Sequence, residues 1–272
     1  MKTTKGLEIP KNVHIAVIGY EIDRIVEPLK RTGVGRFYLL INKKESRRGE
    51  KFIEILKKKI VGTNEKEGLI PPGEFKLVKI DLWDYRDIMS KLCKIINDEV
   101  NKGNNVYVNI SSGSKLAAVA CTLAAFIYGG NPYYVQVREY NYIKLLEEQG
   151  KDLEGLTSGV KAILEIPEYT IERPDEKLVI ALSLIKNAKN NLSQKDLMKE
   201  LEKIGLLKAR GGENNLYIKF RRKYLEPLLA NGWITTKREG KESIITLTNR
   251  GINTLKIFYD VSKSLCNIHQ KD

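Results

Sequence analysis

A hydroxyl-rich turn near the middle of the chain is the feature best suited to hold a small anion. The stretch "NISSGSKLAA" (109–118) follows the apolar run 106–108, which predicts a strand, a turn and the start of a helix. Free N–H groups and the dipole at a helix N-terminus favour a phosphate. The turn adds hydroxyls, a flexible glycine, a cation and an amide that can bind a base or ribose: Ser111, Ser112, Ser114, Gly113, Lys115 and Asn109. These residue types predict a pocket that binds the phosphate and the base or ribose of a nucleotide.

A second turn, "GYEIDR" (19–24), follows the first predicted strand and is expected to form the other wall of the pocket. Gly19 allows backbone to approach a ligand closely, and Tyr20 lies beside it. Glu21 and Asp23 would repel phosphate if they faced it, so they contact ribose hydroxyls or face away. The structural alternative for Asp23 is a first-turn residue that complements the helix dipole.

Neither turn carries a known nucleotide-binding fingerprint. The spacing G-x-x-x-x-G-K-[ST] of a P-loop is absent around Gly113, and G-x-G-x-x-G does not follow the first strand. A single Ser/Gly turn after a strand is often only a helix cap. Two such turns at one edge of a sheet favour a binding site.

The elements that position these turns alternate between strands and helices over residues 13–137. Apolar strand patterns separated by amphipathic helices predict an α/β fold with a Rossmann-like, doubly wound parallel sheet. In this topology strands one and four are neighbours where the winding reverses, and ligands bind beyond their carboxyl ends. We expect a ligand-binding domain at 1–140 and a connector at 141–174, which either adds strands to the sheet or runs as a partly extended link.

Residues 175–272 have a different pattern. Three helical segments, a hairpin that turns at Gly240 and a closing helix predict an α+β winged helix-turn-helix domain. Pro227 removes a helical N–H, so the third helix is expected to kink or restart there.

Positive charge is concentrated in this C-terminal part, which favours a polyanion as its partner. Residues 171–272 hold 20 Lys and Arg against 12 Asp and Glu, whereas residues 1–170 hold 27 against 22. Basic residues on the third helix and at the hairpin tip are the DNA-binding candidates: Lys219, Arg221, Arg222, Lys223, Lys237, Arg238 and Lys241. The alternatives are a solvated charged helix face and a winged helix that binds protein.

Composition argues against several classes of protein. Cys93, Cys121 and Cys266 are far apart and form no metal-ligand pattern, and there are only two histidines, so neither a metal site nor Ser-His catalysis is expected. The scattered cysteines favour a reducing, cytoplasmic setting. No apolar run is long enough to span a bilayer and the first residues lack a secretory signal pattern, so no membrane partner is expected.

The segments "HIAVIGYEIDRIVEPLKRTGVGRFYLL" and "VYVNISSGSKLAAVACTLAAFIYGGNPYYV" together resemble the CARF domain, the CRISPR-associated Rossmann fold. The order of domains resembles the archaeal regulators in which a CARF domain precedes a C-terminal winged helix. The resemblance implies a homodimer whose paired pockets bind a cyclic oligoadenylate, for which we expect cyclic tetra-adenylate, with no cofactor. It places the ligand against residues 19–21, 23, 109 and 111–115.

Two functions from different classes follow. The first is a CRISPR-associated transcriptional regulator whose dimer presents two third helices to an inverted repeat in DNA. The second is a ring nuclease, in which Lys115 would stabilise the charge that develops on phosphate as the ribose 2′-hydroxyl attacks. The lack of a nearby general base favours binding without turnover.

Overall fold

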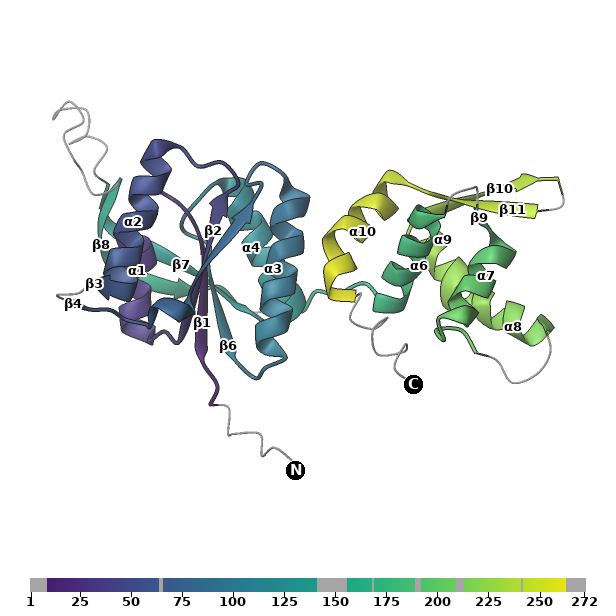
Figure 1. The fold of residues 1–272 in the computed structure, drawn as a ribbon, viewed down its shortest axis with the longest axis horizontal. Coiled ribbons are helices and arrows are strands. Elements are labelled where there is room, and N and C mark those ends of the chain that lie inside the picture. Colours follow the sequence, from purple (N-terminus) through teal and green to yellow (C-terminus); the bar gives the residue numbers. More distant parts are fainter. Residues whose placement is uncertain are drawn as a thin grey trace. The chain divides into compact units, whose positions relative to one another are not determined.

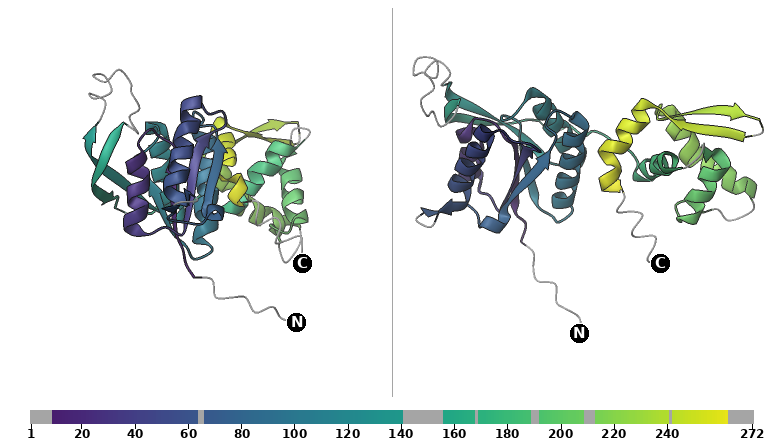
Figure 2. Two further views of the ribbon diagram at one scale, coloured as in Figure 1. Left: turned by 60° about the vertical axis from the view of Figure 1, so that its left-hand side comes forward. Right: turned by 45° about the horizontal axis from the view of Figure 1, so that its top comes forward.

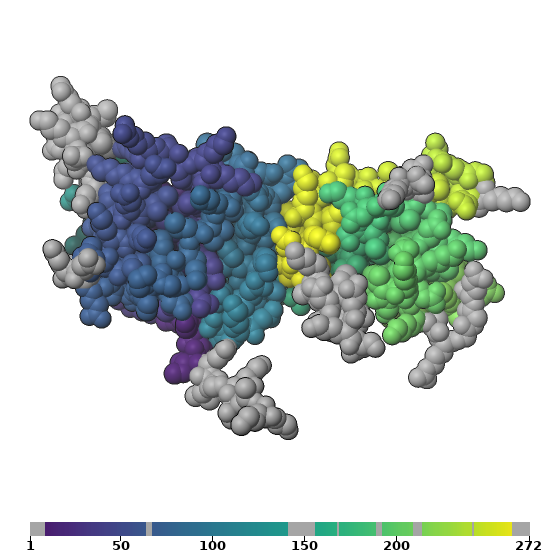
Figure 3. Space-filling view, in the orientation of Figure 1, coloured from purple at the N-terminus to yellow at the C-terminus, as the bar shows by residue number. Residues whose placement is uncertain are grey.

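The computed structural model describes residues 9–63, 66–140, 156–167, 169–188, 192–208, 213–240 and 242–262. The chain divides into two compact units, Met1–Glu172 and Arg173–Asp272. Each unit has its own hydrophobic core. Figure 3 shows the surface of each unit, coloured by residue number.

A six-stranded sheet forms the centre of the first unit (Figure 1). Its strands, in spatial order, are β5 (Phe75–Ile80), β2 (Arg36–Asn42), β1 (Asn12–Val17), β6 (Asn105–Asn109), β7 (Asn131–Tyr140) and β8 (Thr157–Glu165). β1 pairs in parallel with both β2 and β6, so the winding reverses between β1 and β6 as predicted. The Rossmann-like, doubly wound fold is confirmed.

Two helices cover each face of this sheet (Figure 1, Figure 2). α1 (Ile22–Thr32) and α2 (Arg47–Val61) pack on one face, and α3 (Tyr85–Val100) and α4 (Lys115–Tyr128) pack on the other. Ser46, Asp84 and Ser114 cap the N-termini of α2, α3 and α4 with their side chains. Two short strands, β3 (Gly62–Thr63) and β4 (Lys66–Glu67), and a 3-10 turn (Pro72–Glu74) connect α2 to β5.

β8 lies in the range for which the sequence left open a connector or additional strands. It pairs antiparallel with β7, so the sheet ends in an antiparallel edge strand. Two hydrogen bonds attach β8 to α1. The Asp23 carboxylate accepts one from the backbone of Gly159 at 2.9 Å, and Arg31 donates to the carbonyl of Val160 at 3.3 Å.

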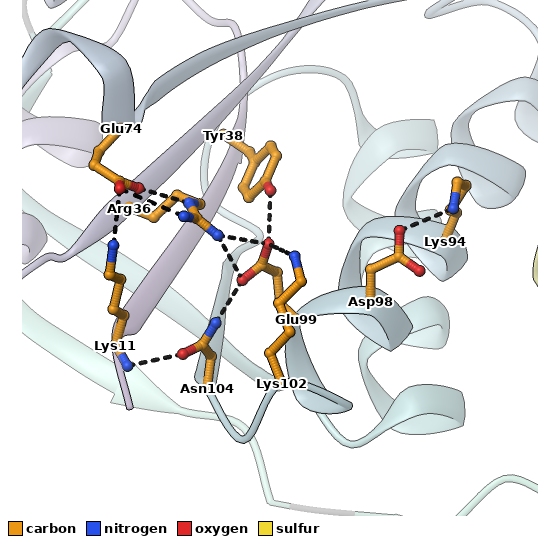
Figure 4. A network of polar contacts seen from close by, with 9 residues as sticks. All are labelled: Lys11, Arg36, Tyr38, Glu74, Lys94, Asp98, Glu99, Lys102 and Asn104. Atoms are coloured by element: carbon orange, nitrogen blue, oxygen red, sulfur yellow. Dashed lines mark hydrogen bonds and ion pairs between the residues drawn. The ribbon is translucent and has the colours of Figure 1, made fainter. Parts of the chain in front are cut away.

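An ion network holds the amino end of the sheet together (Figure 4). Arg36, at the start of β2, forms ion pairs with Glu74 at 2.6 Å and with Glu99 at 3.0 Å. Lys11 pairs with Glu74 at 2.8 Å, and the hydroxyl of Tyr38 donates to Glu99 at 2.8 Å. The Glu99 side chain is only 1% exposed, so this network satisfies a charge that burial would otherwise penalise.

The second unit contains helices and a three-stranded sheet of order β10-β11-β9. In chain order its elements are α6 (Glu176–Asn187), β9 (Leu192–Ser193), α7 (Gln194–Lys203), α8 (Glu213–Phe220), the π-helical turn η2 (Arg221–Leu225), α9 (Glu226–Ala230), β10 (Ile234–Glu239), β11 (Glu242–Leu247) and α10 (Asn249–Ser262). Their apolar faces meet in one core, in which Leu197, Phe220 and Leu228 are fully buried.

The third helix predicted for the winged helix domain is divided into three consecutive segments, α8, η2 and α9. In the π turn the N–H of Glu226 bonds to the carbonyl of Arg221, five residues earlier, and Pro227 occupies the first turn of α9, where its missing N–H costs little. The expected restart near Pro227 is confirmed. The wider turn also keeps both Phe220 and Tyr224 in the core, at 0% and 1% exposure.

Candidate functional site

The two turns named from the sequence meet at the carboxyl ends of β1 and β6. A Cβ atom added at Gly19 would lie 2.8 Å from the backbone nitrogen of Gly113, and one added at Gly113 would lie 2.8 Å from a methyl of Val17. Gly113 has φ +83°, a conformation that L-residues with a side chain rarely adopt. Glycine is therefore needed at both positions for the turns to touch.

Three polar residues of the serine turn are used within the fold. Asn109, 1% exposed, donates to the carbonyl of Arg24 at 2.8 Å and accepts from the N–H of Ser111 at 2.8 Å. The Ser112 hydroxyl donates to the carbonyl of Val17 at 2.8 Å, and the Ser111 hydroxyl accepts from the N–H of Val135 at 2.5 Å. These side chains hold the turn in shape and join it to β1 and β7.

The rest of the turn faces solvent. Gly113, Ser114 and Lys115 are exposed. The Ser114 hydroxyl accepts from the N–H of Ala117 at 3.1 Å and so caps α4. Among the described residues, no group forms an ion pair or hydrogen bond with the Lys115 ammonium. An exposed helix N-terminus beside a lysine is suited to bind an anion, and the binding itself stays a prediction.

Both acids of the first turn have hydrogen-bond or ion-pair partners within the fold. Glu21 pairs with Arg24 at 3.1 Å, and Asp23 accepts the hydrogen bond from Gly159. Burial raises the pKa of Glu21, and the neighbouring charge of Arg24 opposes that rise. Each acid is thus engaged within the fold, and its contact with a ribose hydroxyl stays a prediction.

Arg24 is a functional candidate that the sequence pattern did not indicate. It is 6% exposed, and it donates to the carbonyl of Ser111 at 2.9 Å and to the hydroxyls of Tyr134 and Tyr140 at 3.3 and 3.2 Å. Its Nε is buried without a hydrogen-bond partner among the described residues. Because its partners come from both turns and from β7, only the folded structure shows its central position.

A cleft of about 170 Å³ lies beside the junction of the two turns. It extends across the carboxyl ends of β1, β2 and β5 to the start of α4. Its lining includes residues of the predicted turns and residues that follow β2 and β5: Gly19, Tyr20, Asn42, Glu45, Trp83 and Ser114. The rule that ligands bind at the carboxyl edge of such a sheet could have indicated the β2 and β5 loops, but only the two loops at the winding reversal were predicted to form the site.

A larger cavity of about 610 Å³ lies at the opposite, amino edge of the sheet. His14 lines it, with its ring nitrogens 3.3 Å from the Tyr133 hydroxyl and 3.0 Å from the Thr32 hydroxyl. Burial lowers the pKa of His14 to about 4, so the ring is neutral at physiological pH. This histidine belongs to a satisfied polar cluster, distant along the strands from the serine turn.

The basic residues expected to bind DNA differ in their surroundings. Lys219 donates to the carbonyl of Lys208, and Arg221 pairs with Glu226 at 2.9 Å. Arg222 and Lys223 are exposed on the π turn, without an ion-pair partner among the described residues. On the hairpin, Lys237 and Arg238 are exposed on β10, and Lys241 lies outside the described residues.

In the described part of the chain, no group of three or more His, Cys, Asp or Glu side chains is arranged to hold a metal ion. Burial raises the pKa of the thiols of Cys93 and Cys121 to about 12. Cys266 lies outside the described residues.

No helix in the described ranges has the length and apolar character to cross a membrane.

Comparison with known families gives two separate matches, one in each of the two compact units. Residues 177–259 match the family model described as the DUF6293 C-terminal winged helix domain. The second unit is a winged helix domain. Residues 12–140 match a model described as "HFX_2341_N:-like, N-terminal". The predicted architecture, a Rossmann-like α/β domain followed by a winged helix domain, is confirmed.

A curated relative is the uncharacterized protein MJ1513 of Methanocaldococcus jannaschii. It is 32% identical over 212 residues, which are 70% of this chain, and the chain spans 60% of that relative's length.

Two solved structures show a distant likeness. Can2 from Sulfobacillus thermosulfidooxidans in complex with cyclic tetra-adenylate is 13% identical, with a TM-score of 0.37 over 94% of this chain and 67% of that one. Csm6 from Enterococcus italicus bound to cyclic hexa-2′-fluoro-hexa-dAMP is 12% identical, with a TM-score of 0.40 over 83% of this chain and 55% of that one. Likenesses this distant do not carry a ligand over to this protein.

Proposed function

We propose that this protein is a homodimeric, ligand-responsive DNA-binding regulator of CRISPR defence. Its CARF-like domain binds a cyclic oligoadenylate, and its winged helix domain binds DNA. The proposed ligand is cyclic tetra-adenylate. The observation that carries the ligand site is the close approach of Gly19 and Gly113, which presents Ser114 and Lys115 together at the N-terminus of α4. That arrangement provides N–H groups, a hydroxyl and a cation for a phosphate.

The surface beside the turn supports a dimer. Leu116 and Val119, on the first turns of α4, are 38% and 54% exposed, although they are large apolar side chains. A two-fold interface across this face would bury them and bring two serine turns together. A cyclic oligoadenylate has the same two-fold symmetry, so each subunit would bind an equivalent half.

The winged helix domain supports DNA as the second partner. Arg222 and Lys223 are available on the third helix, and Lys237 and Arg238 lie on the wing. Such cations neutralise phosphates and supply most of the salt-dependent affinity for DNA. A two-fold dimer would place its third helices on an inverted repeat, with half-sites about one helical turn apart. Ligand binding would bias their spacing through a coupling of about 1–3 kcal/mol.

The test is a titration of the full chain with cyclic tetra-adenylate by calorimetry, followed by gel shifts on its own upstream DNA with and without the ligand. We expect stoichiometric binding at one ring per dimer and a ligand-dependent change in DNA affinity. Lys115→Ala should weaken ring binding about 10-fold or more, because it removes a charge-assisted hydrogen bond to phosphate. Lys58→Ala, which removes an exposed lysine from the last turn of α2, is the matched control. Equal affinity for random and upstream DNA would contradict regulation.

A ring nuclease is the second candidate, favoured by the exposed ammonium of Lys115, which has no ion-pair partner in the described part of the chain. Incubation of the protein with cyclic tetra-adenylate, followed by chromatography, separates the two functions. Linear products that disappear in Lys115→Ala would support the nuclease. An intact ring after prolonged incubation would support binding alone.

A further inference from the structure

The cleft beside the serine turn has two aromatic walls. Trp83, in the loop between β5 and α3, is 81% exposed, and its backbone N–H is held by Asp81 at 3.0 Å. Tyr20 is 36% exposed, and its ring makes an edge-to-face contact with Phe52 at a centroid distance of 4.8 Å. The guanidinium of Arg48 lies over the Tyr20 ring, 5.0 Å from its centroid. An indole this exposed has a ring face available to stack on another planar group.

The polar lining of the cleft does not suit a phosphate. Glu45 contributes a carboxylate, of which one oxygen accepts from the N–H of Asn42 at 2.6 Å. In the described part of the chain, no hydrogen bond or ion pair involves the other oxygen. That oxygen would repel a phosphate, but it can accept a hydrogen bond from an exocyclic amine.

Anion-binding and base-binding groups are thus separated along this edge of the sheet. Ser114 and Lys115 lie at the start of α4, whereas Glu45 and Trp83 follow β2 and β5, on the far side of β1. A nucleotide whose phosphate lies on the serine turn would therefore direct its base into the cleft.

We propose that this cleft is a nucleobase subsite for adenine. Trp83 binds the ring by stacking, Tyr20 contributes an apolar wall, and the Glu45 carboxylate accepts a hydrogen bond from the N6 amine. This inference rests on the proposed function and deepens it, because it assigns the group that distinguishes adenine from other bases to a residue outside both turns.

Stacking is tested by calorimetry with cyclic tetra-adenylate and by tryptophan fluorescence. Trp83→Ala should weaken binding about 10-fold or more, and Trp83→Phe should stay within about 3-fold of the parent, because the ring face is retained. The chain has two tryptophans, and Trp233 is 7% exposed within the winged helix domain. Ligand should quench the emission of the parent protein, and that quenching should be absent in Trp83→Phe.

The role of Glu45 is tested by comparing cyclic tetra-adenylate with cyclic tetra-inosinate, in which the amine is replaced by a carbonyl. The parent protein should prefer the adenine ring about 10-fold or more, because the carboxylate repels the carbonyl oxygen. Glu45→Gln should reduce this preference, since its amide can donate to that oxygen. If Glu45 has a purely structural role, Glu45→Gln should lower the affinity for both cyclic ligands by the same factor.

The outcomes separate this inference from the function on which it rests. If the parent protein binds the ring and Trp83→Ala binds it equally well, the base subsite is wrong and the proposed function stands. If the parent protein binds no cyclic oligoadenylate, the proposed function is contradicted, and adenosine 5′-monophosphate then tests the cleft alone. Quenching of Trp83 by this nucleotide but not by ribose 5-phosphate supports the subsite, and its absence overturns it.

Discussion

The backbone nitrogen of Gly113 lies 2.8 Å from the position that a Cβ atom of residue 19 would occupy. The turns after β1 and β6 therefore touch through their backbones, although 94 positions separate these two glycines in the sequence. This close approach creates the exposed edge at which Ser114 and Lys115 begin α4.

Gly113→Ala should destabilise the Rossmann-like domain by about 3 kcal/mol, because a side chain is strained at φ +83° and would collide with Val17. Gly129→Ala is the matched control, since Gly129 ends α4 in the left-handed region, at φ +75° and ψ +31°, with no neighbouring atom within 4 Å of an added Cβ. It should cost about 1–2 kcal/mol, the conformational part alone. Urea unfolding measures both, and equal losses would show that the close approach at Gly113 is unimportant.

Arg24→Met should lower the free energy of unfolding by about 3 kcal/mol, because it leaves the largely buried carboxylate of Glu21 without its partner. Adding Glu21→Gln to this variant should recover part of the loss, since a neutral amide costs less to bury than a carboxylate. The measurement is a double-variant cycle by urea unfolding. Strict additivity of the two substitutions would contradict the coupling of this pair.

The ion network at the amino end of the sheet predicts a stability that depends on acid pH. The guanidinium of Arg36 lowers the pKa of Glu74 to about 2, and the hydrogen bond from Tyr38 helps to lower that of Glu99 despite burial. A carboxyl whose pKa is depressed on folding stabilises the native state above its unfolded pKa, near 4.5, and loses that contribution as pH falls toward about 2. Amide hydrogen exchange in β1 and β2 should therefore accelerate between about pH 4.5 and 2 beyond its intrinsic pH dependence.

Glu74→Gln is the variant that checks this assignment. It removes the titrating group, so protection in β2 should be lower at neutral pH and should change less on acidification. An unchanged pH profile in this variant would contradict the network as the source of the acid sensitivity.

Charge removal on the π turn should weaken DNA binding and its salt dependence. Each cation that no longer neutralises a phosphate reduces the slope of log K against log salt by about 0.9, so Arg222→Gln combined with Lys223→Gln should reduce it by about 2. Arg221→Gln removes a guanidinium that is already paired with Glu226, so its effect should be smaller. Fluorescence anisotropy over a series of salt concentrations measures the slopes, and similar effects of all three substitutions would show that the ion pair opens on DNA.

Local pattern in the sequence is sufficient to predict the elements and their order. Alternating apolar strands and capped amphipathic helices indicate a doubly wound sheet, and the change of pattern after Asp175 indicates the winged helix, because each signal depends on neighbours within one element. The turns at Gly19 and Gly113 were predictable for the same reason.

The tertiary structure alone decided what the polar groups of those turns do. Asn109, Ser111 and Ser112 use their hydrogen bonds on β1, β7 and α1, and their sequence is the same whether they face a ligand or the core. Arg24 and Trp83 were missed because burial of a cation and exposure of an indole depend on residues distant in sequence. The predicted parallel sheet already places the β5 loop at the same edge as the serine turn, but which side chains of that loop are exposed is set by packing between distant segments.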